Sequence, residues 1–66
     1  MPLSKAVELA QAKRQLRRIE EDRPAFELRL KAMGASPEAT EQGMRWFNGV
    51  HARAEERVRE LEAESG

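Results

Sequence analysis

The chain has 66 residues, with twelve basic and twelve acidic side chains and no cysteine. A chain of this length forms one domain with a thin core, and the lack of cysteine excludes a disulfide framework and a thiolate metal site. Because the charges balance, no global field attracts nucleic acid or an acidic membrane, and no segment is apolar enough to span a bilayer.

The first predicted element is a helix from about residue 4 to residue 33, rich in alanine, leucine, arginine and glutamate, with Ser4 as a suitable N-cap. Steps of three and four residues along it give an apolar seam that one charged side chain interrupts. The members of this seam are Leu9, Ala12, Leu16, Ile19, Arg23, Phe26, Leu30 and Met33. We expect the helix to bury this face.

Pro24 lies inside this predicted helix. The seam keeps its phase on both sides of the proline, which two separate helices would not require. We therefore expect one helix that is kinked at Pro24, where a backbone hydrogen bond is lost at a cost of about 3 kcal/mol. In the alternative, Asp22 caps a new helix with Pro24 in its first turn, and the chain forms a three-helix bundle.

The clearest turn signal is the string MGASPEA, residues 33 to 39. Gly34 suits the position after a helix, Ser36 suits an N-cap, and Pro37 suits the first turn of the next helix. The string predicts a loop over residues 34–36 and a second helix from about residue 37 to residue 64. The seam of this second helix is interrupted by one histidine and consists of Thr40, Met44, Phe47, His51, Ala54, Val58 and Leu61.

Two helices of similar length joined by so short a loop must lie antiparallel. The sequence therefore predicts an all-α fold, in which a single helical-hairpin domain covers residues 1–66. In the register that this hairpin sets, Phe26 meets Phe47 and Met33 meets Thr40.

The same register places Arg23 beside His51. We interpret this pair as a polar layer that fixes the register, with the guanidinium bound to a glutamate or to the carbonyl freed by Pro24. The alternative is an anion or acid–base site. No nucleophile and no second histidine accompany the pair, so we expect no catalytic residue, no cofactor and no bound metal.

A second apolar stripe lies outside the two seams. It combines side chains of both helices, and we call it the Trp46 stripe: Trp46, Val50, Gly43, Ala39 and Leu28. We expect it to pair two chains into a homodimeric four-helix bundle, with Gly43 and Gly49 allowing the helices to approach closely around Trp46. The alternative is a set of scattered surface hydrophobic residues.

Four basic residues form a strip on the outer face of the first helix: Lys13, Arg14, Arg17 and Arg18. A strip of this kind suits contact with the phosphates of a nucleic acid, but no exposed aromatic side chain or helix-turn-helix pattern accompanies it. Arg17 and Arg18 are also spaced to form ion pairs with Glu21 and Asp22, one turn further along the helix. We prefer this second interpretation.

The string FNGVHARAEERVREL, residues 47 to 61, resembles the end of the small subunit of exodeoxyribonuclease VII, another short helical hairpin. The spacing of its two halves differs, and the match covers less than a quarter of the chain. The resemblance implies only a small helical accessory subunit.

These features predict a cytoplasmic protein that is not an enzyme and that acts through protein–protein contacts, as an adaptor, regulatory subunit or accessory subunit. We expect a homodimer that uses the Trp46 stripe for self-association or for a larger protein partner, without membrane contact. The alternative function is nucleic-acid binding through the basic strip.

Overall fold

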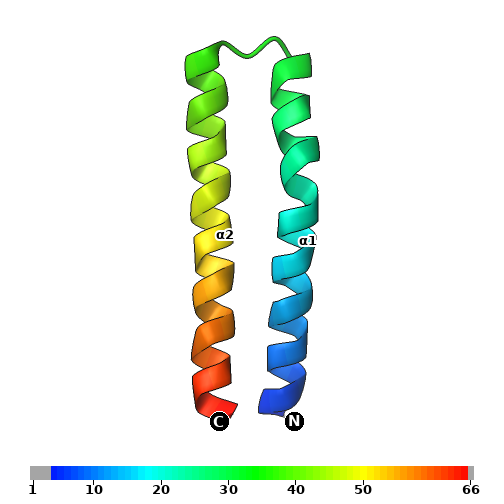
Figure 1. Ribbon diagram of the computed structural model, residues 1–66, viewed down its shortest axis with the longest axis vertical. Coiled ribbons are helices and arrows are strands. Elements are labelled where there is room, and N and C mark those ends of the chain that lie inside the picture. Colours follow the sequence, from blue (N-terminus) through cyan, green and yellow to red (C-terminus); the bar gives the residue numbers. More distant parts are fainter. Residues whose placement is uncertain (1–3, 66) are drawn as a thin grey trace.

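The computed structural model describes residues 4–65 as an antiparallel hairpin of two helices, α1 (Lys5–Ala32) and α2 (Pro37–Ser65) (Figure 1). The all-α fold and the antiparallel pairing are as predicted. The observed helix ends differ by one residue from the predicted ends at residues 4, 33 and 64, and agree at Pro37. Neither helix is both long and apolar enough to cross a membrane within the part of the chain that is described.

Both predicted N-caps are present. The Ser4 hydroxyl accepts a hydrogen bond from the Val7 amide at 3.2 Å, and the Ser36 hydroxyl accepts one from the Ala39 amide at 3.1 Å. Each serine thus satisfies one of the amides that the first turn of a helix leaves without a partner. The starts of α1 and α2 are therefore fixed by local side chains.

The chain reverses direction at Gly34, whose φ is 80°. The Ala35 amide donates to the Leu30 carbonyl at 3.1 Å, and the Gly34 amide donates to the Lys31 carbonyl at 3.0 Å. These are the two bonds of a Schellman motif, which requires a left-handed residue directly after the helix. Glycine adopts that conformation without steric cost, so Gly34 ends α1 and starts the turn.

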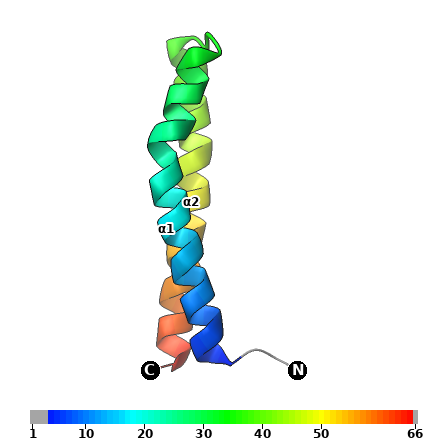
Figure 2. The ribbon, with the colours of Figure 1, turned by 90° about the vertical axis from the view of Figure 1, so that its right-hand side faces the viewer.

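Helix α1 continues through Pro24, as the phase of the seam predicted. The three-helix alternative is therefore excluded. Figure 2 shows that α1 curves gently along its length, as long helices commonly do.

The core is thin and lies along the two predicted seams. Its buried cluster, at the terminal end of the hairpin, consists of Ala12, Val58 and Leu61, with Leu9 and Leu16 packed against it. Nearer the loop, the ring of Phe26 stacks on that of Phe47, with centroids 5.1 Å apart.

Met33 does not extend the core as predicted. It is the C-cap residue of α1, and its side chain is 75% exposed. At that height α1 has ended and the chain is reversing, so no further turn of helix covers the methionine.

Gly43 allows α2 to approach α1 closely near the loop. A Cβ added at Gly43 would lie 2.7 Å from Cδ1 of Leu30, whereas one added at Gly49 would meet no atom within 4 Å. The two glycines therefore differ, because only Gly43 is needed for packing inside the hairpin.

The two helices carry opposite net charge. Helix α1 has eight basic and five acidic residues, a net charge of +3, and α2 has four basic and seven acidic residues, a net charge of −3. Lys5 contacts Glu64 at 2.9 Å and Lys13 contacts Glu62 at 3.9 Å across the hairpin. The hydrogen bond to Glu64, and then the charges of Glu64 and Glu8, raise the pKa of Lys5 above its ordinary value. These exposed pairs support the pairing of the helices only weakly.

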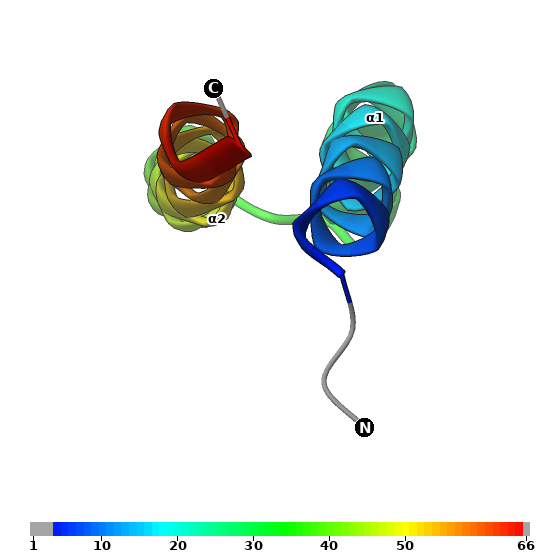
Figure 3. The ribbon, with the colours of Figure 1, turned by 90° about the horizontal axis from the view of Figure 1, so that it is seen from below.

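The hairpin is a single layer with two open faces. Figure 3 shows the two helices side by side, with no other element of the described chain packed on either face. The Cα atoms extend over 46 × 18 × 15 Å, and the radius of gyration is 15.1 Å. A compact domain of this length would have a radius of about 11 Å. Most side chains outside the two seams therefore face solvent.

Pro24→Ala should stabilise the hairpin, because alanine restores the missing backbone hydrogen bond and is a better helix former. We expect the free energy of unfolding in urea to rise by about 1–3 kcal/mol. The control is Glu21→Ala, an exposed substitution one turn earlier that should change this value by less than about 0.5 kcal/mol. A loss of stability in Pro24→Ala would contradict the continuous helix.

Gly49→Ala and Gly43→Ala form a matched pair, since both replace glycine inside α2. Gly49→Ala should raise the free energy of unfolding by about 1 kcal/mol, because its new methyl group enters open space. Gly43→Ala should gain distinctly less, because Leu30 must move. The measurement is the urea midpoint at a protein concentration where sedimentation gives a monomer. Equal gains would show that α2 does not approach Leu30 as described.

Candidate protein-interaction surface

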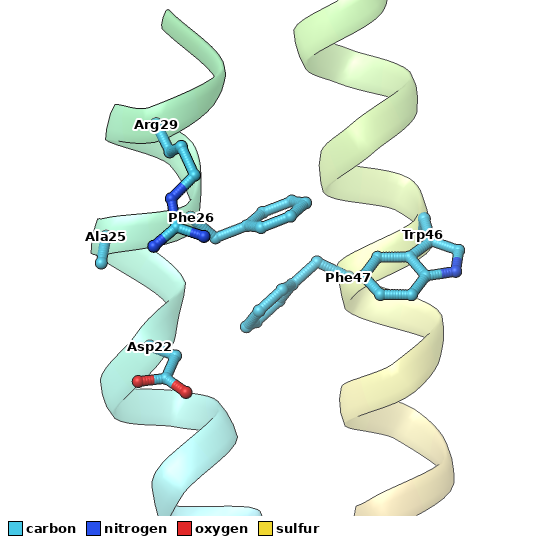
Figure 4. A pocket seen from close by; sticks show the side chains of 6 residues that line it. All are labelled: Asp22, Ala25, Phe26, Arg29, Trp46 and Phe47. Atoms are coloured by element: carbon cyan, nitrogen blue, oxygen red, sulfur yellow. The ribbon is translucent and has the colours of Figure 1, made fainter. Parts of the chain in front are cut away.

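Trp46 lies on the outer part of α2 and is 64% exposed. Its ring centroid is 5.9 Å from that of Phe26, at a tilt of 36°. Figure 4 shows Phe26 and Phe47 pointing toward each other between the helices, and the six-membered ring of Trp46 turned toward them. The indole nitrogen lies on the side away from α1 (Figure 4), and within residues 4–65 it has no hydrogen-bond partner. The large apolar ring of Trp46 therefore packs toward Phe26 on one side, and the rest of the ring is exposed to solvent.

A groove of about 330 Å³ runs between α1 and α2 beside this ring (Figure 4). Apolar side chains of both helices line it, with one acidic and one basic residue of α1: Asp22, Ala25, Phe26, Arg29, Trp46 and Phe47. Among the described residues, the side chains of Asp22 and Arg29 form no hydrogen bond or ion pair. The groove thus combines an aromatic floor with two free, opposite charges.

A smaller groove of about 190 Å³ lies on the other side of Trp46. Gly49 and Val50 line it together with Trp46 and two arginines, Arg45 and Arg53. The indole therefore separates two depressions. A third depression, nearer the chain ends, is lined mostly by polar groups: Glu8, Gln11, Ala12, Gln15 and Arg57.

The structure separates the predicted Trp46 stripe into parts with different surroundings. Val50 is half-buried and lines the smaller groove, and Ala39 is exposed nearer the loop. Gly43 faces Leu30 inside the hairpin, so its missing side chain already has a packing role there. Leu28 is 70% exposed and lines neither groove.

Arg23 and His51, the two residues of the predicted polar layer, contact other residues and not each other. The Arg23 guanidinium donates to Oδ1 of Asn48, and not to a glutamate or to a carbonyl freed by Pro24. The contact of Arg23 with Asn48 could not be predicted from the seams, because position 48 lies one residue outside the seam of α2.

His51 contacts two carboxylates, one on α1 and one on its own helix α2. Its Nε2 is 3.0 Å from Oε2 of Glu20, and its Nδ1 is 3.2 Å from Oε1 of Glu55. The His51 side chain is 19% exposed. Both ring nitrogens therefore face acceptors, which leaves neither directed at a ligand site. Among residues 4–65, no three His, Cys, Asp or Glu side chains lie where they could hold a metal ion.

The predicted basic strip is only partly paired. Lys13 contacts Glu62 at 3.9 Å. Arg14, Arg17 and Arg18 are exposed, and within the described chain they form no ion pair. The predicted pairs of Arg17 with Glu21 and of Arg18 with Asp22 are therefore wrong. Solvent competes for such exposed side chains, and the rotamer that closes the pair costs entropy.

The sequence interpretation missed two residues of the larger groove, Asp22 and Arg29. Asp22 was assigned to a pair with Arg18, and Arg29 was not singled out. Their spacing could have indicated this face. Asp22, Ala25 and Arg29 are three and four residues apart and so share one face of the helix beside the seam.

Comparison of the chain with protein-family models, with curated proteins and with solved structures finds no match. The function must therefore be argued from these surfaces.

Proposed function

We propose that this chain is a small, non-enzymatic helical interaction module, which acts as an adaptor, regulatory subunit or accessory subunit and pairs with a second copy of itself. The observation that carries the proposal is the exposure of Trp46 beside the larger groove. A surface with an aromatic centre and a charged rim has the composition of a protein–protein contact.

The accessible surface of the chain supports self-association. This surface is 5427 Å², whereas a compact monomer of 7.5 kDa would expose about 4,200 Å². The surplus of about 1,200 Å² exceeds the roughly 800 Å² that each partner contributes to a standard interface. Pairing of two hairpins would bury part of this surplus and give the thin core a second layer.

Trp46→Glu should weaken the dimer strongly, because each copy loses an aromatic contact of about 2–3 kcal/mol and gains a buried charge. Sedimentation at micromolar concentration should give a dimer for the wild type and a dissociation constant at least about a hundredfold higher for the variant.

The matched control is Val7→Glu, which places the same charge on an exposed apolar residue near the start of α1, far along the hairpin from Trp46 of α2. It should leave the dissociation constant within about threefold of the wild-type value. A fully helical, stable wild-type monomer at this concentration would refute self-association.

A second candidate function is nucleic-acid binding, which the three unpaired arginines of the basic strip favour. Arg14, Arg17 and Arg18 lie within one turn and a half of α1 and form no ion pair with any described residue. Such side chains are free to replace the counterions of a phosphate backbone.

Replacing all three arginines by alanine tests this candidate. If the strip binds duplex DNA, affinity should fall steeply with salt, and the triple variant should reduce the log–log salt slope by about 3. The measurement is fluorescence anisotropy with a labelled duplex over a salt series. Binding that is equal for wild type and triple variant would exclude the strip as the binding surface.

A further inference from the structure

Asp22 and Arg29 lie on α1 along the larger groove, with Ala25 and Phe26 midway between them. They are separated by seven residues, or about two helical turns, and neither has a partner among the described residues. Two free, opposite charges that flank an apolar floor are complementary to the same surface turned end for end.

We propose that the second copy docks face to face and antiparallel, about a two-fold axis at the height of the Phe26–Phe47 stack. The inference rests on the proposed self-association and specifies its geometry. Asp22 then faces Arg29 of the second copy, and Arg29 faces Asp22 of the second copy, because the axis passes midway between the two positions. Ala25, which is small, lies near the axis and allows the two α1 helices to approach.

The same axis accounts for the surface of α2. The midpoint between Trp46 and Gly49 lies at Phe47 and Asn48. Phe47 stacks on Phe26 with centroids 5.1 Å apart, so this midpoint has the same height along the hairpin as the midpoint on α1. One axis therefore also places each Trp46 at the smaller groove of the other copy.

The smaller groove suits an incoming indole. Gly49 has open space where a side chain would lie, and Val50 supplies an apolar wall. Arg53 and Arg45, whose guanidinium contacts Glu41 at 3.1 Å, border the groove, and guanidinium groups stack favourably on the face of tryptophan. Trp46 of each copy thus meets a groove with an apolar wall and two arginines at its border.

The distribution of polar groups favours the antiparallel arrangement over one with both loops at the same end. With the axis at the Phe26–Phe47 stack, the ends of the hairpin near the termini project beyond the overlap. The polar depression there, which includes Glu8, Gln15 and Arg57, stays in water. The same-end arrangement would bury it and would bring Arg18 of one copy to within about a turn of Arg53 of the other.

The test uses charge reversal at the two free residues. Asp22→Arg alone places arginine opposite arginine at both contacts, and Arg29→Asp alone places aspartate opposite aspartate. Each variant should dimerise with a dissociation constant at least about tenfold higher than that of the wild type. Circular dichroism should show unchanged helicity, because both positions are exposed.

The decisive experiment mixes the Asp22→Arg and Arg29→Asp variants. In the mixed dimer, the guanidinium introduced at position 22 of one chain would face the carboxylate introduced at position 29 of the other. The two remaining native side chains would also face each other, so both attractions return. We expect the equimolar mixture to recover a dissociation constant within about threefold of the wild-type value. The double variant Asp22→Arg/Arg29→Asp should recover it in a single chain.

The outcomes distinguish this geometry from self-association in general. A wild-type monomer at high micromolar concentration would overturn both proposals. A wild-type dimer that neither single reversal weakens, or a mixture that does not recover, would overturn the axis and leave self-association standing.

Spin labels provide a measurement that does not depend on affinity, because the chain has no native cysteine. Single Ala63→Cys labels in the dimer should lie about 45 Å apart along the hairpin, since each is about fifteen residues from the axis. Short distances at Ala63 would overturn the antiparallel axis.

Discussion

The reversal of the chain at Gly34 fixes every contact between the two helices. Because Gly34 is left-handed, the amides of Gly34 and Ala35 reach the carbonyls of Lys31 and Leu30 in the last turn of α1, and α2 begins only three residues later at Pro37. A connection this short permits only antiparallel neighbours, and it sets the height of each residue of α2 against α1. The stack of Phe26 on Phe47 and the cluster of Ala12, Val58 and Leu61 follow from that register.

A two-helix hairpin covers only one stripe of each helix, and this limit explains the surface. The seams are used inside the hairpin, so apolar residues beside them have nothing to pack against. Trp46 shows the consequence most clearly, since one edge of its ring reaches Phe26 and the rest is exposed. Small domains with so thin a core commonly gain stability by association with a further chain.

Two sets of charged side chains differ in their surroundings. Across the hairpin, Arg23 binds Asn48 and His51 contacts Glu20. Lys5 and Lys13 of α1 contact Glu64 and Glu62 of α2. These contacts favour one register, because a shift of α2 by one turn would separate each of them. Beside the larger groove, in contrast, Asp22 and Arg29 are left without a partner in the described chain, and the docking proposal depends on that difference.

The sequence by itself determined the elements and their pairing. Spacings of three and four marked the seams, the unchanged phase across Pro24 marked one helix, and Ser4, Gly34 and Ser36 marked the helix ends. These signals are local or periodic, so they can be read without coordinates. Only the tertiary structure decided which side chains are satisfied. Asn48 rather than a glutamate binds Arg23, Gly43 serves packing while Gly49 stays open, and Asp22 is free rather than paired with Arg18. Those outcomes depend on the distance between two helix surfaces and on competition with solvent, and residue spacing along one helix contains neither.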